Sequence, residues 1–208
     1  RLNILNYSPQ LPISVVPPGI DIKELNLTNT AKKPKFPLVI MCGYFDNKSN
    51  TDAALWFIKS IWPLIISRNN KIRCWFIGKG INNEMMRASL NKSNITMIPD
   101  IDDLRPYRKS ASVFINPMRL GSGLRIKILE AMGSGLPVVS TSLGAAGIPA
   151  QNGENCFIGD TPKEFADAIL WLINDKNLAN RIGENGKDMV KQRYEINKCI
   201  KLFESICN

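Results

Sequence analysis

The 208-residue sequence contains no histidine. Within these residues this excludes Ser-His and Cys-His nucleophilic catalysis and histidine metal sites. No apolar run reaches the length of a membrane span and no signal peptide opens the chain, so we expect a soluble protein. The five cysteines are odd in number and include no Cys-x-x-Cys pair. Because Cys42 and Cys74 fall in apolar runs of strand length, we expect free thiols and a reducing, cytoplasmic location.

Acidic residues are fewer than basic ones, 18 against 27, which gives a net charge of +9. This charge favours an anionic ligand or an anionic membrane surface, so peripheral contact at the inner face of the membrane stays open. Nucleic acid is the competing partner. The basic residues are spread along the chain without an aromatic ladder or zinc-finger spacing, and we therefore expect no nucleic-acid binding.

From residue 38 onward, apolar runs of strand length alternate with segments of helix length. This pattern predicts an α/β fold with a Rossmann-like, doubly wound parallel sheet of about six strands in a single domain. The domain is expected to span 38–208 and to end in two or three helices. Residues 1–37 are predicted to be a linker and entry segment, and the chain to be part of a longer polypeptide. The strand-length runs lie at 38–42, 72–77, 94–98, 112–116, 136–140 and 156–158.

A glycine turn between two of these runs is followed directly by a predicted helix. Gly121-Ser-Gly123 is the turn, and helix formers extend from Leu124 to Met132. The backbone N–H groups at 123–125 would then be the free donors of a helix N-terminus, which suits phosphate. Arg125 and Lys127 add cations to that first turn, where a cation is unfavourable unless an anion lies opposite. The alternative is a crossover helix whose charged side chains face water.

Glu130 lies in the same predicted helix among apolar residues. We expect its carboxylate to be partly enclosed, and a buried carboxylate needs partners. The hydroxyl groups of a ribose are one candidate. Lys127, three residues earlier, is the other.

Five segments occur in an order typical of one enzyme family. Gly121–Ser140 is the most specific, and Ile98–Tyr107 is similar to that family's base-recognition loop. Together they resemble the carboxyl-terminal, donor-binding half of a group 1, retaining glycosyltransferase of the GT-B fold. The other three are Ile13–Asp21, Val39–Phe45 with Asn50–Trp56, and Trp75–Gly80.

The resemblance implies transfer of a sugar, with retention, from a nucleoside diphosphate sugar to a glycan or lipid-linked acceptor, in cell-surface polysaccharide synthesis. It also implies an acceptor domain upstream, no metal and no cofactor. No catalytic residue is assigned, and we expect little or no activity without the acceptor domain. The expected donor-binding residues are Gly43, Tyr44, Lys48, Gly78, Lys79, Pro99, Asp100, Ile101, Arg119, Gly121, Ser122, Gly123, Leu124, Arg125, Lys127 and Glu130.

The sequence departs from the family pattern in two places. Members commonly carry two glutamates separated by seven residues, the first for the donor sugar and the second for the ribose. Here the second is Glu130, and Ser122 replaces the first. This predicts tolerance of deoxy, amino-acylated or uronic sugars, unless Ser122 only caps the following helix. The arginine and lysine that many members place after the first strand are Tyr44 and Ser49, so other cations must meet the phosphate charge. Arg125, Lys127, Lys48 and Arg119 are available.

Three competing interpretations remain. Gly78-Lys-Gly80 after a strand suggests a nicotinamide-binding fingerprint, but Asn83 replaces its third glycine and the strand is the second one. The acidic residues from Asp100 to Asp103 suggest a cation site, although helix capping near Asp102 and Asp103 is favoured. A non-catalytic nucleotide-binding module is the alternative to an enzyme.

Overall fold

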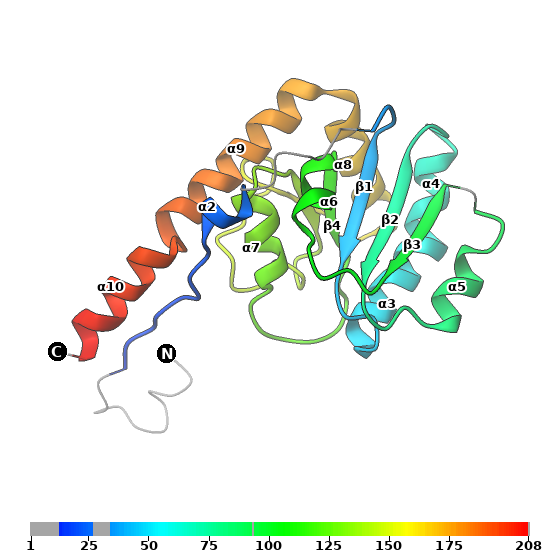
Figure 1. The fold of residues 1–208 in the computed structure, drawn as a ribbon. Coiled ribbons are helices and arrows are strands. Elements are labelled where there is room, and N and C mark those ends of the chain that lie inside the picture. The colour runs from blue at the N-terminus through cyan, green and yellow to red at the C-terminus, as the bar shows by residue number, and fades with distance from the viewer. Residues whose placement is uncertain (1–12, 27–33, 93, 208) are drawn as a thin grey trace.

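The computed structural model describes residues 13–26, 34–92 and 94–207. They contain a six-stranded parallel sheet in the order β3-β2-β1-β4-β5-β6 (Figure 1). This is the doubly wound order, in which the strand order reverses between β1 and β4. The predicted fold class is therefore confirmed. The strands are β1 (Leu38–Cys42), β2 (Arg73–Gly78), β3 (Ile95–Pro99), β4 (Val113–Asn116), β5 (Val138–Ser140) and β6 (Phe157–Ile158).

Both faces of the sheet are covered, which explains why β1 is apolar throughout. Val39 and Met41 pack into one core, whereas Leu38, Ile40 and Cys42 pack into the other. The first core is built with α3 (Lys48–Trp56), η1 (Phe57–Ile61), α4 (Trp62–Ile66), α5 (Asn83–Ser89) and α8 (Pro162–Asn174). The second is built with α6 (Arg105–Ser110), α7 (Ile126–Gly133) and α9 (Lys176–Arg193).

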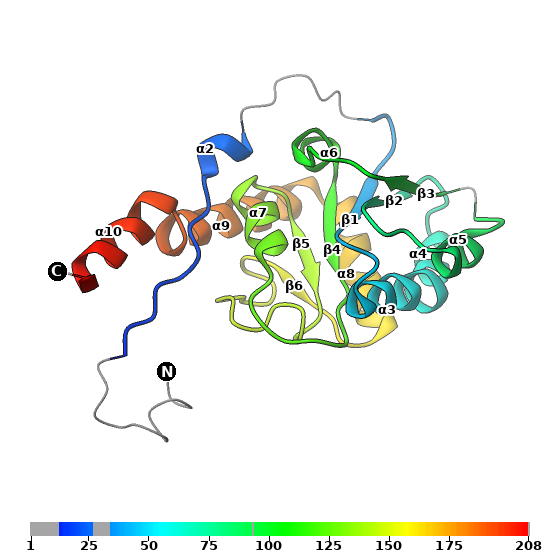
Figure 2. The same cartoon turned by 60° about the horizontal axis from the view of Figure 1, so that its bottom comes forward.

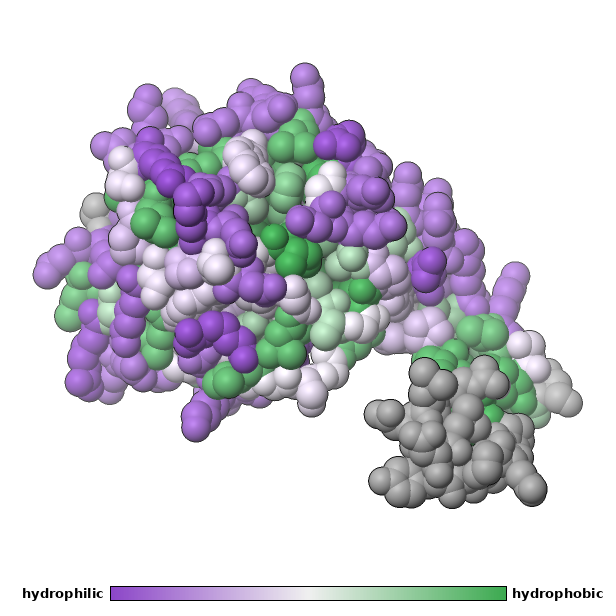
Figure 3. Space-filling view, turned by 180° about the vertical axis from the view of Figure 1, so that it is seen from behind, coloured by the Kyte–Doolittle hydropathy of each residue, from purple (hydrophilic) through white to green (hydrophobic). Residues whose placement is uncertain are grey.

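The predicted closing helices are α8, α9 and α10 (Ile196–Cys207). α10 extends away from the sheet beside the segment that precedes α2 (Ile22–Leu25), as Figures 1 and 2 show. Ile20 ties that segment to the start of α10, because its N–H donates to the Tyr194 carbonyl and its carbonyl accepts from the Ile196 N–H. α10 and the segment before α2 form an arm, and Figure 3 shows hydrophobic side chains at its outer end. The exposed hydrophobic residues of α10 are Ile200, Leu202, Phe203 and Ile206.

α2 and the Ile20 contact lie within residues 1–37, so part of the predicted linker is ordered against the domain. Residues 1–12 and 27–33 of that prediction lie outside the described residues. In the part of the chain that the structure describes, no helix is both long enough and apolar enough to cross a membrane. Cys42 and Cys74 are buried free thiols, as predicted.

Candidate functional site

The loops that follow β1 to β4 open at one edge of the sheet, because parallel strands bring their carboxyl ends together. Gly43 follows β1 directly, and Gly78, Pro99 and Asn116 are the last residues of β2, β3 and β4. The predicted site residues at strand ends therefore share this edge. The crevice between β1 and β4 is the point where such sheets bind ligands.

The loops after β1 and β2 are locked together. Gly78 has φ of 138°, and a Cβ there would lie 2.1 Å from the Gly43 carbonyl oxygen. A Cβ on Gly80 would lie 2.4 Å from the Asp46 backbone nitrogen. The Phe45 N–H also donates to the Lys79 carbonyl at 2.7 Å. Both glycines are required because two backbones approach closely.

Helix α7 begins at Ile126, two residues later than predicted. Gly121 and Gly123 adopt φ of 95° and 86°, and Arg125 is the extended N-cap residue. The Arg125 guanidinium donates to the carbonyl of Ser122 at 3.0 Å. The helix-start donors are therefore the N–H groups of Ile126 and Lys127, and Arg125 braces the glycine turn. The capping role considered for Ser122 is wrong, and its side chain is exposed.

Lys127 reaches from α7 to the first turn of α3. Its Nζ donates to Asn50 Oδ1 at 2.8 Å, and Asn50 Nδ2 donates to the Tyr44 carbonyl at 2.8 Å. The pKa of Lys127 is lowered to about 8, mainly by burial; the Cys42 side chain opposes this shift and the Arg125 charge adds to it. Asn50 was not predicted as a site residue. A polar residue opening the helix after β1 was the only sequence signal for it.

Glu130 pairs with Arg108 of α6. Glu130 Oε2 lies 2.8 Å from Arg108 Nη1, so the pairing with Lys127, considered as the alternative to a ribose contact, is wrong. The reason is geometric, since the Lys127 side chain is directed to α3. Arg108 is 7% exposed and its Nε has no partner, whereas the Glu130 side chain keeps 33% exposure. Sequence reasoning missed Arg108, because α6 also contains Arg105 and Lys109 and no local pattern distinguishes the one basic residue that is buried.

Other predicted cations have partners or lie in solvent. Arg119 makes two contacts with Asp52, at 2.7 and 3.2 Å, and its guanidinium lies 5.1 Å from the Trp56 ring centroid. Lys79 lies 3.6 Å from Asp102 in an exposed pair. Lys48 and Tyr44 are exposed. Among the predicted cations, Lys127 and Arg125 are half-buried and form no ion pair with an acidic side chain of the described residues. Arg125 donates to carbonyls of its own turn, whereas Lys127 reaches a side chain on α3.

The loop after β3 leads into α6. Asp100 has φ of 55°, and Ile101 packs against the second core. Asp103 Oδ1 accepts the Arg105 N–H at 2.9 Å, and hydrogen bonds from Arg105 lower the pKa of Asp103. The N-cap residue of α6 is Leu104, without a side-chain cap bond, so Asp103 contacts the helix start from one residue before the N-cap. Asp102 pairs with Lys79 instead of capping. Among the described residues, no group of three or more Cys, Asp or Glu side chains is arranged to hold a metal.

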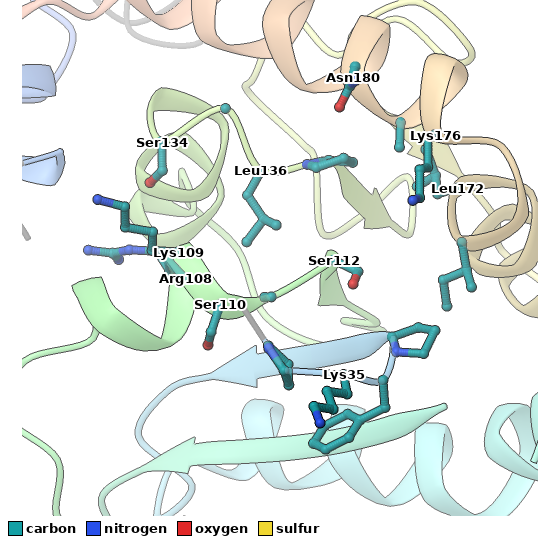
Figure 4. A pocket seen from close by; sticks show the side chains of 18 residues that line it. Lys35, Arg108, Lys109, Ser110, Ser112, Ser134, Leu136, Leu172, Lys176 and Asn180 are labelled. Atoms are coloured by element: carbon teal, nitrogen blue, oxygen red, sulfur yellow. The ribbon is translucent and has the colours of Figure 1, made fainter. Parts of the chain in front are cut away.

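A cavity of about 740 Å³ lies at the opposite edge of the sheet, before β1, β4 and β5 (Figure 4). Lys35, Ser112 and Lys176 line it. Its serines already have partners within the chain: Ser134 Oγ donates to the Glu130 carbonyl, and Ser112 Oγ accepts the Leu38 N–H. The sheet edge at the switch point between β1 and β4 therefore remains the better candidate site.

Residues 36–175 match the family model for glycosyl transferases group 1. The chain belongs to this family. It is 24% identical over 202 residues to the capsular polysaccharide biosynthesis glycosyltransferase CapM of Staphylococcus aureus, covering 91% of this chain and 52% of CapM. The chain spans about half the length of the curated relatives it matches.

Solved structures of this family have the same fold. A carboxyl-terminal domain of the group 1 protein LpcC from Francisella tularensis has a TM-score of 0.67 and 20% identity, covering 86% of this chain and 100% of that domain. A TarM variant from Staphylococcus aureus, solved with fondaparinux, α-GlcNAc-glycerol and UDP, has a TM-score of 0.80 and 17% identity. The match covers 100% of this chain and 42% of TarM. The chain thus corresponds to the carboxyl-terminal half of GT-B glycosyltransferases.

Proposed function

We propose that the chain is the donor-binding half of a retaining glycosyltransferase. The enzyme would move a sugar from a nucleoside diphosphate sugar to a glycan or lipid-linked acceptor in cell-surface polysaccharide synthesis. Family membership, the capsular relative and the UDP bound to TarM support this assignment. The free thiols fit a cytoplasmic location, and the charge of +9 fits peripheral contact with an anionic membrane.

One observation carries the proposal: α7 presents Lys127 and Glu130 one turn apart at the switch-point edge. Three residues of helix rise correspond to about 4.5 Å, a spacing that suits adjacent phosphate and ribose groups. Lys127 is a partly buried cation held by a neutral amide, and Glu130 keeps exposed carboxylate surface beside Arg108. A diphosphate would meet the ammonium, and the ribose hydroxyls would donate to the carboxylate.

The proposed chemistry is electrostatic. When the glycosidic bond to the donor breaks, negative charge develops on the leaving diphosphate. Lys127 and the N–H groups at the start of α7 would stabilise that charge without a metal. The acceptor domain would bring the attacking hydroxyl and close over the donor. The exposed apolar residues of α10 provide a surface for contact with that domain.

Calorimetric titration with UDP, GDP, dTDP and ADP, each beside its nucleoside, tests the proposal. We expect one diphosphate to bind at least 10-fold more tightly than its nucleoside, as a charge-assisted phosphate contact requires. The affinity should be unchanged by EDTA. Binding of no diphosphate, or binding that requires a divalent cation, would contradict the proposal.

A further inference from the structure

Lys127 is held by an uncharged partner. Its Nζ donates to Asn50 Oδ1 at 2.8 Å, and no acidic side chain of the described residues forms an ion pair with it. An ammonium group has three N–H donors, so this bond leaves two for another acceptor. A carboxylate in the place of Asn50 would cancel the charge that an anionic ligand needs. The amide fixes the ammonium without neutralising it.

Asn50 is itself fixed from its other side. Its Nδ2 donates to the Tyr44 carbonyl at 2.8 Å, and its backbone N–H donates to the Asn47 carbonyl at 3.0 Å. A Cβ on Gly43 would lie 3.3 Å from Asn50 Nδ2, so the amide packs against the turn after β1. Because the nitrogen must face the Tyr44 carbonyl, the amide oxygen is left for Lys127.

We propose that Asn50 is a positioning residue that holds the Lys127 ammonium at the turn after β1, ready for the diphosphate of the donor. This inference rests on the proposed function and adds a residue to it. Burial lowers the pKa of Lys127 to about 8, which an ion pair would have opposed. A bound anion would stabilise the charged form of Lys127, which burial disfavours. Diphosphate affinity should therefore fall as the pH rises above about 8.

The alternative is a structural role in which Asn50 only braces the Tyr44 carbonyl. That role predicts that a change at Asn50 loosens the loop and weakens nucleoside and diphosphate binding alike. It also predicts that the effects of Asn50 and Lys127 substitutions add. A positioning residue loses its effect once Lys127 is gone, so the two substitutions do not add.

The experiment is a double-mutant cycle on the 208-residue chain, titrated with UDP and uridine, or with whichever of the GDP, dTDP and ADP pairs binds best. We expect Lys127→Ala and Asn50→Ser each to weaken diphosphate binding about 10-fold, with nucleoside binding unchanged. The double variant should bind no worse than Lys127→Ala. Circular dichroism and thermal unfolding verify that each variant is folded.

Asn50→Asp keeps the shape of the side chain. This variant replaces Asn50→Ser in the experiment if Asn50→Ser does not fold. Asn47→Asp is the matched control, because Asn47 is the N-cap of α3 and aspartate also caps helices. Both substitutions add one negative charge to the same turn, but only the side chain at position 50 contacts Lys127. We expect the larger loss of diphosphate affinity in Asn50→Asp, with its pH-dependent decline moved to higher pH.

The outcomes separate the two levels of the proposal. Unchanged diphosphate binding in Lys127→Ala would overturn the phosphate role of Lys127 and, with it, the proposed function. If Lys127→Ala weakens binding but Asn50→Ser has an additive effect, or none, the role of Asn50 is rejected and the proposed function stands. Equal losses of diphosphate affinity in Asn50→Asp and Asn47→Asp would also reject the positioning role of Asn50.

Discussion

Arg108 Nη1 lies 2.8 Å from Glu130 Oε2, which gives the carboxylate proposed to bind ribose a buried cationic partner on α6. The pair joins the helix after β3 to the helix after β4. Arg108 is 7% exposed, so its charge depends on Glu130 for compensation.

Glu130→Gln should therefore have two effects. We expect the free energy of unfolding to fall by about 1–3 kcal/mol, because Arg108 loses its counter-charge. The preference for a ribonucleoside diphosphate over its 2′,3′-dideoxy analogue should also disappear. Denaturant unfolding measures the loss of stability, and calorimetry measures the ribose preference. Glu184→Gln, on the exposed side of α9, is the control. Lost stability with an unchanged ribose preference would make Glu130 only the counter-ion of Arg108.

Arg125→Ala tests whether Arg125 braces the glycine turn or binds phosphate. Its guanidinium donates to the Ser122 carbonyl at 3.0 Å, so the substitution should cost about 1 kcal/mol of unfolding free energy. If bracing is its main role, diphosphate binding should weaken less than in Lys127→Ala. A loss of diphosphate affinity without any change in stability would show direct phosphate contact instead.

Ser122→Glu introduces the carboxylate that the family pattern of the sequence analysis has at this position. Because Ser122 is exposed and does not cap α7, the variant should fold normally. We expect it to alter affinity for the nucleoside diphosphate sugar relative to the free diphosphate, and uronic donors should lose most through charge repulsion. Ser205→Glu on α10 adds the same charge far along the chain. Identical relative affinities in both variants would place Ser122 outside the sugar pocket.

The pH dependence of stability reports on Lys127 directly. Its pKa is about 8 in the folded chain against 10.5 in the unfolded chain, so above pH 8 the unfolded state binds more protons. Stability attributable to Lys127 therefore rises with pH. Cys42 acts in the opposite direction above pH 9, because burial raises its pKa from 9.0 to about 12. From pH 7 to pH 9 the native chain should gain stability relative to Lys127→Met. If the difference in unfolding free energy between the native chain and Lys127→Met stayed constant over this pH range, the lowered pKa of Lys127 would be contradicted.

Gly78→Ala and Gly123→Ala separate backbone strain from steric overlap. Both positions have positive φ, at 138° and 86°, but a Cβ at Gly78 meets the Gly43 oxygen whereas Gly123 has nothing within 4 Å. Gly123→Ala should cost about 1 kcal/mol, and Gly78→Ala about 2 kcal/mol more because the two loops must separate. Equal losses in urea unfolding would show that the loops are not locked.

The strands were predictable because each is a short, mostly apolar run, and β1 was predicted to the residue. The start of α7 was missed by two residues because Arg125 folds back on the turn, a contact that propensity does not encode. The partners of Lys127 and Glu130 lie 77 and 22 positions away in the sequence. Such contacts depend on how α3, α6 and α7 pack, which no local pattern specifies.

α7 contacts a helix from each side of the sheet, since Lys127 reaches α3 and Glu130 pairs with α6. A nucleoside diphosphate bound to both side chains would act as a clamp between two otherwise separate hydrophobic layers. Amide hydrogens in α3 and α6 should then gain protection from exchange together, although the two helices lie on opposite faces. Ligand binding at this edge would therefore stabilise both faces of the domain together, rather than order a single loop.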